Sequence, residues 1–272
     1  MRTSARSSPL LLAARHADVV DHRQARATEP PLHRTKYHRS VRAHLSIAGL
    51  VVFVGCGRLD FDPGDADLIA WYPLDSVGGG VAIDATGHGH SGTCNDAATC
   101  PRVVPGRHGN AMQFDGVDDV LVVAPSPAFN TSAFTMTLWA RLDTPPPNTG
   151  CLVGKIYGTA TDNSWQLCIN SPNNKLEFAS NSETLSVPGV MPTGSWHHVA
   201  IRWDGITKTL SFDGADLVSA AEAITFDAGA ITIGADLDAG SQVAPIAATL
   251  DDIRVYGRAL EPAEITSLAT AP

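Results

Sequence analysis

Two adjacent carboxylates, Asp251 and Asp252, stand directly before an apolar-alternating run in the segment TLDDIRVY near the C-terminus. Such a pair could be catalytic, half of a metal site, or the polar start of a strand. Glycoside hydrolysis needs two carboxylates about 5–9 Å apart that face one substrate. Adjacent strand residues point to opposite faces, so this pair does not meet that requirement. Alternation places Asp251 on the core side with Ile253 and Val255. It places Asp252 outward beside Arg254.

A carboxylate on the core side is costly unless it is paired or bound to a metal. Calcium prefers six to eight oxygen ligands, usually from several loops. Asp84, in a glycine-rich turn, and Asp115, in FDG, offer such oxygens. The sequence therefore predicts a calcium site formed by Asp84, Asp115 and Asp251. The alternative is that Asp115 caps a turn and Asp251 accepts hydrogen bonds from backbone amides.

Trp139 and Arg141 form a candidate ligand-binding pair. They share the strand face opposite the apolar row that begins at Phe134. If that face is exposed, an aromatic ring beside a guanidinium suits a sugar ring or a carboxylate. The alternative is that both side chains pack beneath a crossing loop. The neighbouring His197 and His198 are expected on opposite strand faces, which excludes joint binding of one ion from a regular strand.

The basic N-terminal segment contains a short apolar run, LSIAGLVVFV, that ends at Gly55 and Cys56. The run is too short to span a bilayer but matches the apolar region of a signal peptide. FVGC resembles a bacterial lipobox, which implies a lipidated Cys56 at the mature N-terminus. We therefore expect a disordered or mis-assigned start over 1–40, a lipoprotein signal peptide over 41–56 and a tether over 57–66. The implied location is the cell envelope, with a lipid anchor in the outer membrane or at the cell surface.

Four further cysteines remain, an even number without CxxC spacing, so disulfide bonds are favoured over zinc. Four cysteines allow three pairings. We favour Cys94 with Cys100, which closes a short loop, and Cys151 with Cys168, which joins two strands of a hairpin.

The composition fits one large domain, since 44% of the 272 residues are hydrophobic. Residues 56–272 hold 10 Lys+Arg and 25 Asp+Glu, a net charge of about −15. A nucleic-acid partner is therefore not expected.

Short strand patterns separated by Gly, Pro, Asn and Asp dominate the chain after residue 67. The segment FTMTLWARL shows period-two alternation, which is typical of a half-buried antiparallel strand. The one expected helix is short and C-terminal, with Pro262 near its start. These elements predict an all-β, two-sheet antiparallel sandwich with one short C-terminal helix.

Seven motifs occur in a characteristic order: LIAWYPLD, DATGHGHSGT, GRHGNAMQFDG, FTMTLWARL, GSWHHVAIRWDG, SFDG and LDDIRVYGRALEPAEI. Together they resemble the LamG-like jelly-roll domain of the concanavalin A-like lectin/glucanase superfamily, over residues 67–272. The resemblance implies a jelly-roll sandwich that binds carbohydrate or protein at cell surfaces, often with calcium.

The glucanases of this superfamily carry a Glu-x-Asp-x-x-Glu pattern on one strand, and the sequence lacks it. It also lacks Gly-x-Ser-x-Gly, a phosphate-binding loop and His-Glu-x-x-His. We therefore expect a non-catalytic lipoprotein module that binds a glycan or adheres to a surface. The alternatives are an envelope lipoprotein that binds extracellular or envelope proteins, and a glycan hydrolase.

Overall fold

The computed structural model describes residues 66–76, 80–96, 98–157, 162–180, 183–187, 189 and 191–272. The chain divides into two units, Met1–Gly55 and Cys56–Pro272, and every described residue belongs to the second. The expected signal peptide, the lipidated Cys56 and nearly all of the tether lie outside the described residues.

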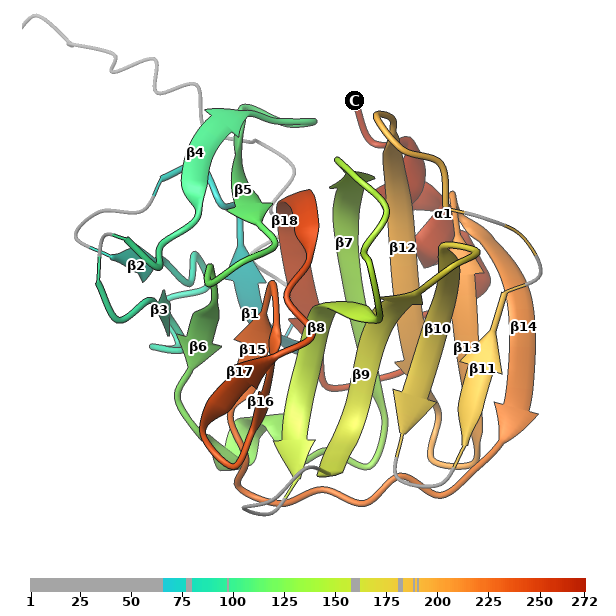
Figure 1. The fold of residues 1–272 in the computed structure, drawn as a ribbon. Coiled ribbons are helices and arrows are strands. Elements are labelled where there is room, and N and C mark those ends of the chain that lie inside the picture. Colours follow the sequence, from blue (N-terminus) through green and yellow to red (C-terminus); the bar gives the residue numbers. More distant parts are fainter. Residues whose placement is uncertain are drawn as a thin grey trace, which may run out of the picture. The chain divides into compact units, whose positions relative to one another are not determined.

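The described part is a sandwich of two antiparallel sheets, as predicted (Figure 1). We call the first sheet A; in it the order is β14-β13-β12-β7-β18-β5-β4, and β1 also pairs with β18. Its strands are β1 (Leu68–Tyr72), β4 (Arg102–Pro105), β5 (Asn110–Asp115), β7 (Phe134–Leu142), β12 (Trp196–Trp203), β13 (Thr207–Phe212), β14 (Ala215–Ala221) and β18 (Ala247–Tyr256).

The second sheet, sheet B, has the order β11-β10-β9-β8-β15-β6-β3-β2. Its strands are β2 (Val81–Ala82), β3 (Gly92–Thr93), β6 (Leu121–Val123), β8 (Gly150–Tyr157), β9 (Asp162–Asn170), β10 (Lys175–Ser180), β11 (Thr184–Ser186) and β15 (Ile231–Ile233). A separate hairpin joins β16 (Asp236–Asp238) and β17 (Ser241–Val243), and a 3-10 turn, η1, covers Pro127–Phe129.

The main core lies between the inner faces of the two sheets. The alternation of β7 is confirmed, because Phe134, Met136 and Leu138 all belong to this core. Phe134 stacks on Trp165 of sheet B, with ring centroids 5.2 Å apart. Trp139, the next residue along β7, is not part of this core and lies on the outer face of sheet A.

Strand β18 changes partners halfway along its length. Its first half pairs with β5 and its second half with β1, on the same edge, while β7 lies along the other edge. The register against β7 shifts between Asp251 and Arg254. Such a bulge inserts an extra residue and reverses the facing of the residues that follow. Leu250 and Ile253 consequently both belong to the core between the sheets.

Both predicted disulfide pairs are present in the structure. Cys94 and Cys100 close the short loop that follows β3, with Cα atoms 5.4 Å apart. Cys151 and Cys168 are directly opposite each other on β8 and β9, with Cα atoms 4.0 Å apart. The second bond therefore joins the two strands of a hairpin, as the sequence predicts.

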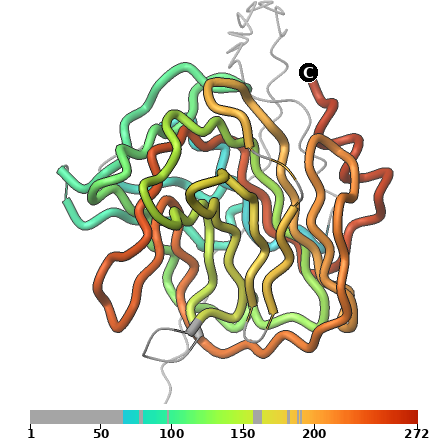
Figure 2. The backbone as a smooth tube through the Cα atoms, turned by 45° about the vertical axis from the view of Figure 1, so that its right-hand side comes forward, coloured from blue at the N-terminus to red at the C-terminus, as the bar shows by residue number. Residues whose placement is uncertain are grey.

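The C-terminal helix α1 (Pro262–Thr270) covers part of the outer face of sheet A. Pro262 begins it, and Glu261 and Glu264 form a reciprocal capping box. Ile265 is fully buried in a second apolar cluster against Ala200 and Tyr256. The helix contacts β12 and β14, and Figure 2 shows it in red beside orange strands. Among the described residues, no helix has the length and apolarity needed to cross a membrane.

Candidate functional site

Asp251 lies on the outer face of sheet A, so the prediction that it shares a face with Ile253 and Val255 is wrong. The register of β18 places Asp251 opposite Trp139 of β7, and the bulge that follows, between Asp251 and Arg254, reverses the facing of Ile253 and Val255. Its side chain is nevertheless fully buried. Its Oδ2 accepts hydrogen bonds from the backbone amides of Arg107 at 2.9 Å and His108 at 2.8 Å.

Asp252 is not the solvated residue that the alternation predicts. It is 9% exposed, and its Oδ1 accepts a 2.6 Å hydrogen bond from the indole Nε1 of Trp71. Arg254 forms an ion pair with its Oδ2 at 3.2 Å. The backbone of Asp252 has a φ of 51°, a left-handed conformation that Asp and Asn tolerate better than most residues. The two carboxylates therefore bind different segments. Asp251 accepts hydrogen bonds from the β4–β5 loop, and Asp252 accepts one from Trp71 of β1.

The loop between β4 and β5 crosses above Trp139. Gly106 is required at its start, since a Cβ there would lie 2.7 Å from Oδ2 of Asp251. The guanidinium of Arg107 lies 4.7 Å from the centroid of the Trp139 ring, and the His108 ring lies 5.8 Å from it. Trp139 is only 6% exposed as a result. The ring is covered by the loop and is not an open platform for a sugar.

Arg141, the other candidate ligand-binding residue, is held by neighbours on the same face. Its Nε lies 3.1 Å from Oδ1 of Asp143, and its Nη2 donates to Oγ1 of Thr249 at 3.0 Å. Its guanidinium also lies 5.2 Å from the ring centroid of Trp196. Arg141 and Trp139 share the predicted face, but the structure gives each its own set of partners.

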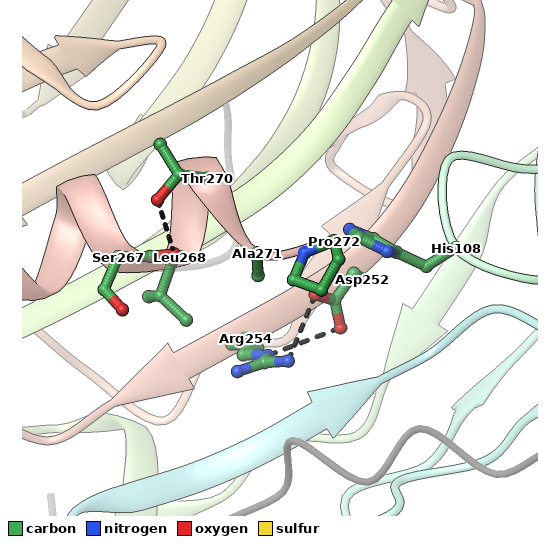
Figure 3. Close-up of a pocket in the computed structure, with 8 residues that line it drawn as sticks. All are labelled: His108, Asp252, Arg254, Ser267, Leu268, Thr270, Ala271 and Pro272. Atoms are coloured by element: carbon green, nitrogen blue, oxygen red, sulfur yellow. Dashed lines mark hydrogen bonds and ion pairs between the residues drawn. The ribbon is translucent and has the colours of Figure 1, made fainter.

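A pocket of about 520 Å³ opens on this outer face, between the β4–β5 loop, the second half of β18 and the end of α1. Figure 3 shows the guanidinium of Arg254 turned toward the carboxylate of Asp252. The pocket is lined by His108, Asp252, Arg254, Ser267, Leu268, Thr270, Ala271 and Pro272. Arg107 ties the loop to the C-terminal segment by a 3.4 Å hydrogen bond to the carbonyl oxygen of Ala271.

His198 of β12 lies buried next to this region, with its ring 5.4 Å from that of Trp139. Burial lowers its pKa to about 4, although the carboxylates of Asp252 and Asp213 act in the opposite direction. His198 is therefore neutral at pH 7, and its Nδ1 has no hydrogen-bond partner in the part of the chain that the structure describes. His197 packs instead on Phe212. The two histidines thus face opposite sides, as predicted.

Asp84, the first of the three predicted calcium ligands, organises its own turn. Oδ1 accepts hydrogen bonds from the amide of Trp71 and from the amide and hydroxyl of Thr86, while Oδ2 accepts from the amide of His90. Burial raises the pKa of Asp84, but these hydrogen bonds outweigh it and leave the pKa below its ordinary value. Both carboxylate oxygens of Asp84 therefore already accept hydrogen bonds from protein donors.

The structure does not bring Asp84, Asp115 and Asp251 into one metal-ligating group. Among the described residues, the acidic group with metal-like spacing is Asp115, Asp118 and Asp119, whose ligand atoms lie within 4.8 Å of one another. Burial raises the pKa of Asp119, and the charges of Asp115 and Asp118 add to this effect. A cation would relieve that repulsion, and carboxylate oxygens suit calcium. Calcium binding stays a proposal, and these three residues are the ones that would hold the ion.

Sequence reasoning missed the residues that shape the pocket. His108 and Arg254 lie within motifs that indicate the fold but not a pocket, because these residues and the segment after Leu268 converge only through the bulge in β18 and the packing of α1. One signal was available in the sequence: two adjacent acids interrupt an otherwise apolar strand pattern, and strict alternation would place one of them in the core. The turn glycine before Arg107 was a second signal.

The comparisons with known proteins agree with this architecture. Residues 115–266 match the family described as the concanavalin A-like lectin/glucanases superfamily. The match covers more than half of the chain, and the protein belongs to this superfamily. No curated protein sequence matches the chain significantly.

Several solved structures share the fold at low sequence identity. Domain 4 of AbnA, a GH43 extracellular arabinanase from Geobacillus stearothermophilus solved with arabinotriose, has a TM-score of 0.60 and 20% identity over 76% of this chain and all of that domain. Trypanosoma rangeli sialidase in complex with sialic acid has a TM-score of 0.61 and 18% identity over 75% of this chain.

The binding domain of Paraclostridial Mosquitocidal Protein 1 has a TM-score of 0.59 and 16% identity, over 75% of this chain and 52% of that one. The chain corresponds to about a third of the sialidase, since 33% of that protein is covered. At sequence identities this low, the structural likeness shows a common fold alone.

Proposed function

We propose that the protein is a glycan-binding module that holds a sugar in the pocket on the outer face of sheet A. The observation that carries this proposal is the pocket itself, in which polar side chains from three separate elements converge. Its volume of about 520 Å³ lies in the range of small-ligand sites, about 300–1,000 Å³. Fold-level likeness to a domain solved with arabinotriose supports a sugar as the ligand.

The charges around the pocket favour an uncharged sugar over an acidic one. The guanidinium of Arg254 pairs with Asp252, and the charge of Arg107 is offset in number by the buried carboxylate of Asp251, which accepts the Arg107 backbone amide. This balance leaves no excess positive charge to attract an anion. The hydroxyl of Ser267 can donate and accept, and Oγ1 of Thr270, which donates its own proton to the carbonyl oxygen of Thr266, can accept; sugar hydroxyls need such partners.

We propose further that the pocket does not cleave glycosidic bonds. Hydrolysis needs a carboxylic acid and a second carboxylate on either side of the scissile bond. Among the described residues that line the pocket, Asp252 alone has an acidic side chain. Its carboxylate is already engaged by the guanidinium of Arg254 and by the indole of Trp71, and the pocket offers no second acidic side chain among the described residues.

The location that fits such a module is the cell envelope. We propose that Cys56 is lipidated and that residues 57–66 tether the domain to a membrane, at the outer membrane or cell surface. The support is the lipobox-like FVGC after a basic and then apolar segment. Disulfide bonds also favour an exported, oxidising location. The partners are then envelope or extracellular glycans.

Affinity electrophoresis against a polysaccharide panel tests the function. The domain from residue 57 onward should be retarded by at least one neutral polysaccharide among arabinan, galactan and xylan, and less by polygalacturonate. Reducing sugar released from the same panel should not rise above a heat-denatured control. Uniform mobility in every gel, together with capture of an envelope protein, would favour the protein-binding alternative.

A further inference from the structure

A serine, a histidine and an aspartate form a hydrogen-bonded relay at the rim of the sandwich, away from the sugar pocket. Ser195 Oγ lies 2.9 Å from Nε2 of His197, and Nδ1 of the same imidazole lies 2.8 Å from Oδ2 of Asp213. None of the three residues lines the pocket of Figure 3. From this geometry we propose that Ser195 is an activated nucleophile for acyl transfer from small carboxylate esters.

The order of atoms in the relay is the one that general-base activation requires. A hydroxyl faces one imidazole nitrogen, and a carboxylate faces the other. The carboxylate fixes the imidazole with its proton on Nδ1, so that Nε2 is free to accept the serine proton. A serine without such a base is a weak nucleophile.

The imidazole is held in place by its surroundings. The His197 ring stacks on Phe212 with centroids 4.7 Å apart and planes 23° apart. Asp213 is fixed in turn, because its Oδ1 accepts the backbone amide of His198 at 3.0 Å. Its own amide donates to the carbonyl oxygen of His198 at 2.8 Å. Asp213 and Gly214, with φ of 47° and 82°, make the tight turn that places this carboxylate.

Ser195 itself is exposed, and so is about half of the Asp213 side chain, which is 49% accessible. An open site suits a short acyl group presented on a larger molecule, such as an acetyl ester on a polymer. Ser195 Oγ attacks the ester carbonyl carbon while His197 takes the hydroxyl proton. The carbon–oxygen bond to the alcohol breaks, and the alcohol leaves with that proton. Water then releases the carboxylic acid and restores the free serine.

Covalent labelling with a fluorophosphonate probe reports the nucleophile directly. The label should map to the tryptic or chymotryptic peptide that holds Ser195, and Ser195→Ala should abolish it. His197→Gln should slow labelling by roughly 10²-fold, the usual contribution of a general base. Ser132→Ala, which removes another exposed serine, is the matched control and should label at the wild-type rate.

Asp213→Asn separates activation from folding. Asn accepts a left-handed φ and retains an oxygen for the His198 amide, so the turn should survive. Circular dichroism melts should match the wild type, while labelling and hydrolysis of p-nitrophenyl acetate should both fall at least about tenfold. Labelling that is absent in the folded wild type, or that proceeds unchanged in His197→Gln or Asp213→Asn, would overturn the proposal.

Discussion

Asp251 and Asp252 show how two identical side chains acquire different roles from one irregularity in a strand. Asp251 receives two backbone amides of the β4–β5 loop, and Asp252 receives the Trp71 indole and the Arg254 guanidinium. The sequence correctly indicated that Asp251 is buried, and the alternative of amide recognition is the arrangement found. It gave the wrong face for Asp251, because strict alternation does not foresee a bulge, and it gave the outward face but the wrong exposure for Asp252.

Removing either carboxylate should destabilise the fold. Asp251→Ala leaves two buried amides unpaired, which costs about 2–4 kcal/mol. Asp252→Ala removes the ion-pair partner of the half-buried Arg254 and places alanine at a positive φ. The free energy of unfolding should fall by about 3 kcal/mol. Asp252→Asn keeps the backbone preference and should lose less. Urea denaturation measures these differences, with the exposed Glu183→Gln as a control that stays within about 0.5 kcal/mol. An Asp252→Ala variant as stable as the wild type would contradict the role assigned to Asp252.

If Asp115, Asp118 and Asp119, at and after the end of β5, bind calcium, the ion should raise the thermal stability of the domain. At 100 times its dissociation constant, the ion contributes about 2.7 kcal/mol, and a chelator removes that gain. Asp118→Asn should abolish the response, whereas Asp84→Asn should retain it because Asp84 is occupied by hydrogen bonds. Differential scanning calorimetry with and without chelator provides the readout. A wild-type melting temperature indifferent to both additives would eliminate the ion.

At the scale of elements, long strands with a clear hydrophobic period were predictable from the sequence, and very short strands were not. The alternation of FTMTLWARL and the apolar strand HVAIRW mark β7 and β12, which lie in the middle of sheet A. Strands such as β2, β3 and β16 have two or three residues, too few for a period to show. The pocket was equally hidden, since it depends on where α1 lies on the sheet.

We expect the stability of the domain to depend on pH through His198, on the outer face of β12. His198 has a pKa lowered to about 4 by burial, while an unfolded histidine titrates near pH 6.5. The folded state therefore resists protonation, and stability is lost as the pH falls below about 6.5 and continues to fall toward pH 4. The charged or titratable neighbours in this environment are Asp252, Asp213, Arg254 and His108.

His198→Gln should flatten this part of the stability profile. Chemical denaturation at pH 7, 6, 5 and 4 measures it, with His88→Gln, in an exposed turn, as the control. Wild type should lose on the order of 3 kcal/mol more than His198→Gln between pH 7 and pH 4. Parallel profiles for the two proteins would show that His198 is not the group responsible.

For the whole molecule, we propose that lipidation at Cys56 decides where the pocket operates. Expressed in a bacterial host with its N-terminal segment, the wild type should partition with membranes and incorporate labelled palmitate. Cys56→Ser should release it and lose the label, while Cys94→Ser should keep the label because that cysteine belongs to a disulfide. Membrane partition that is unaffected by Cys56→Ser would rule out this anchor.

The central claim is that the pocket between α1 and β18 binds a neutral sugar. Isothermal titration calorimetry with arabinotriose, galactotriose and xylotriose tests it most directly, using wild type, Ser267→Trp and Ala263→Trp. The indole at 267 fills the pocket, whereas Ala263 is exposed at the start of the same helix and does not line it. We predict that at least one trisaccharide binds wild type and Ala263→Trp equally and binds Ser267→Trp at least about tenfold more weakly, which is 1.4 kcal/mol. Equal binding to all three proteins, or no heat from any of them, would contradict the account.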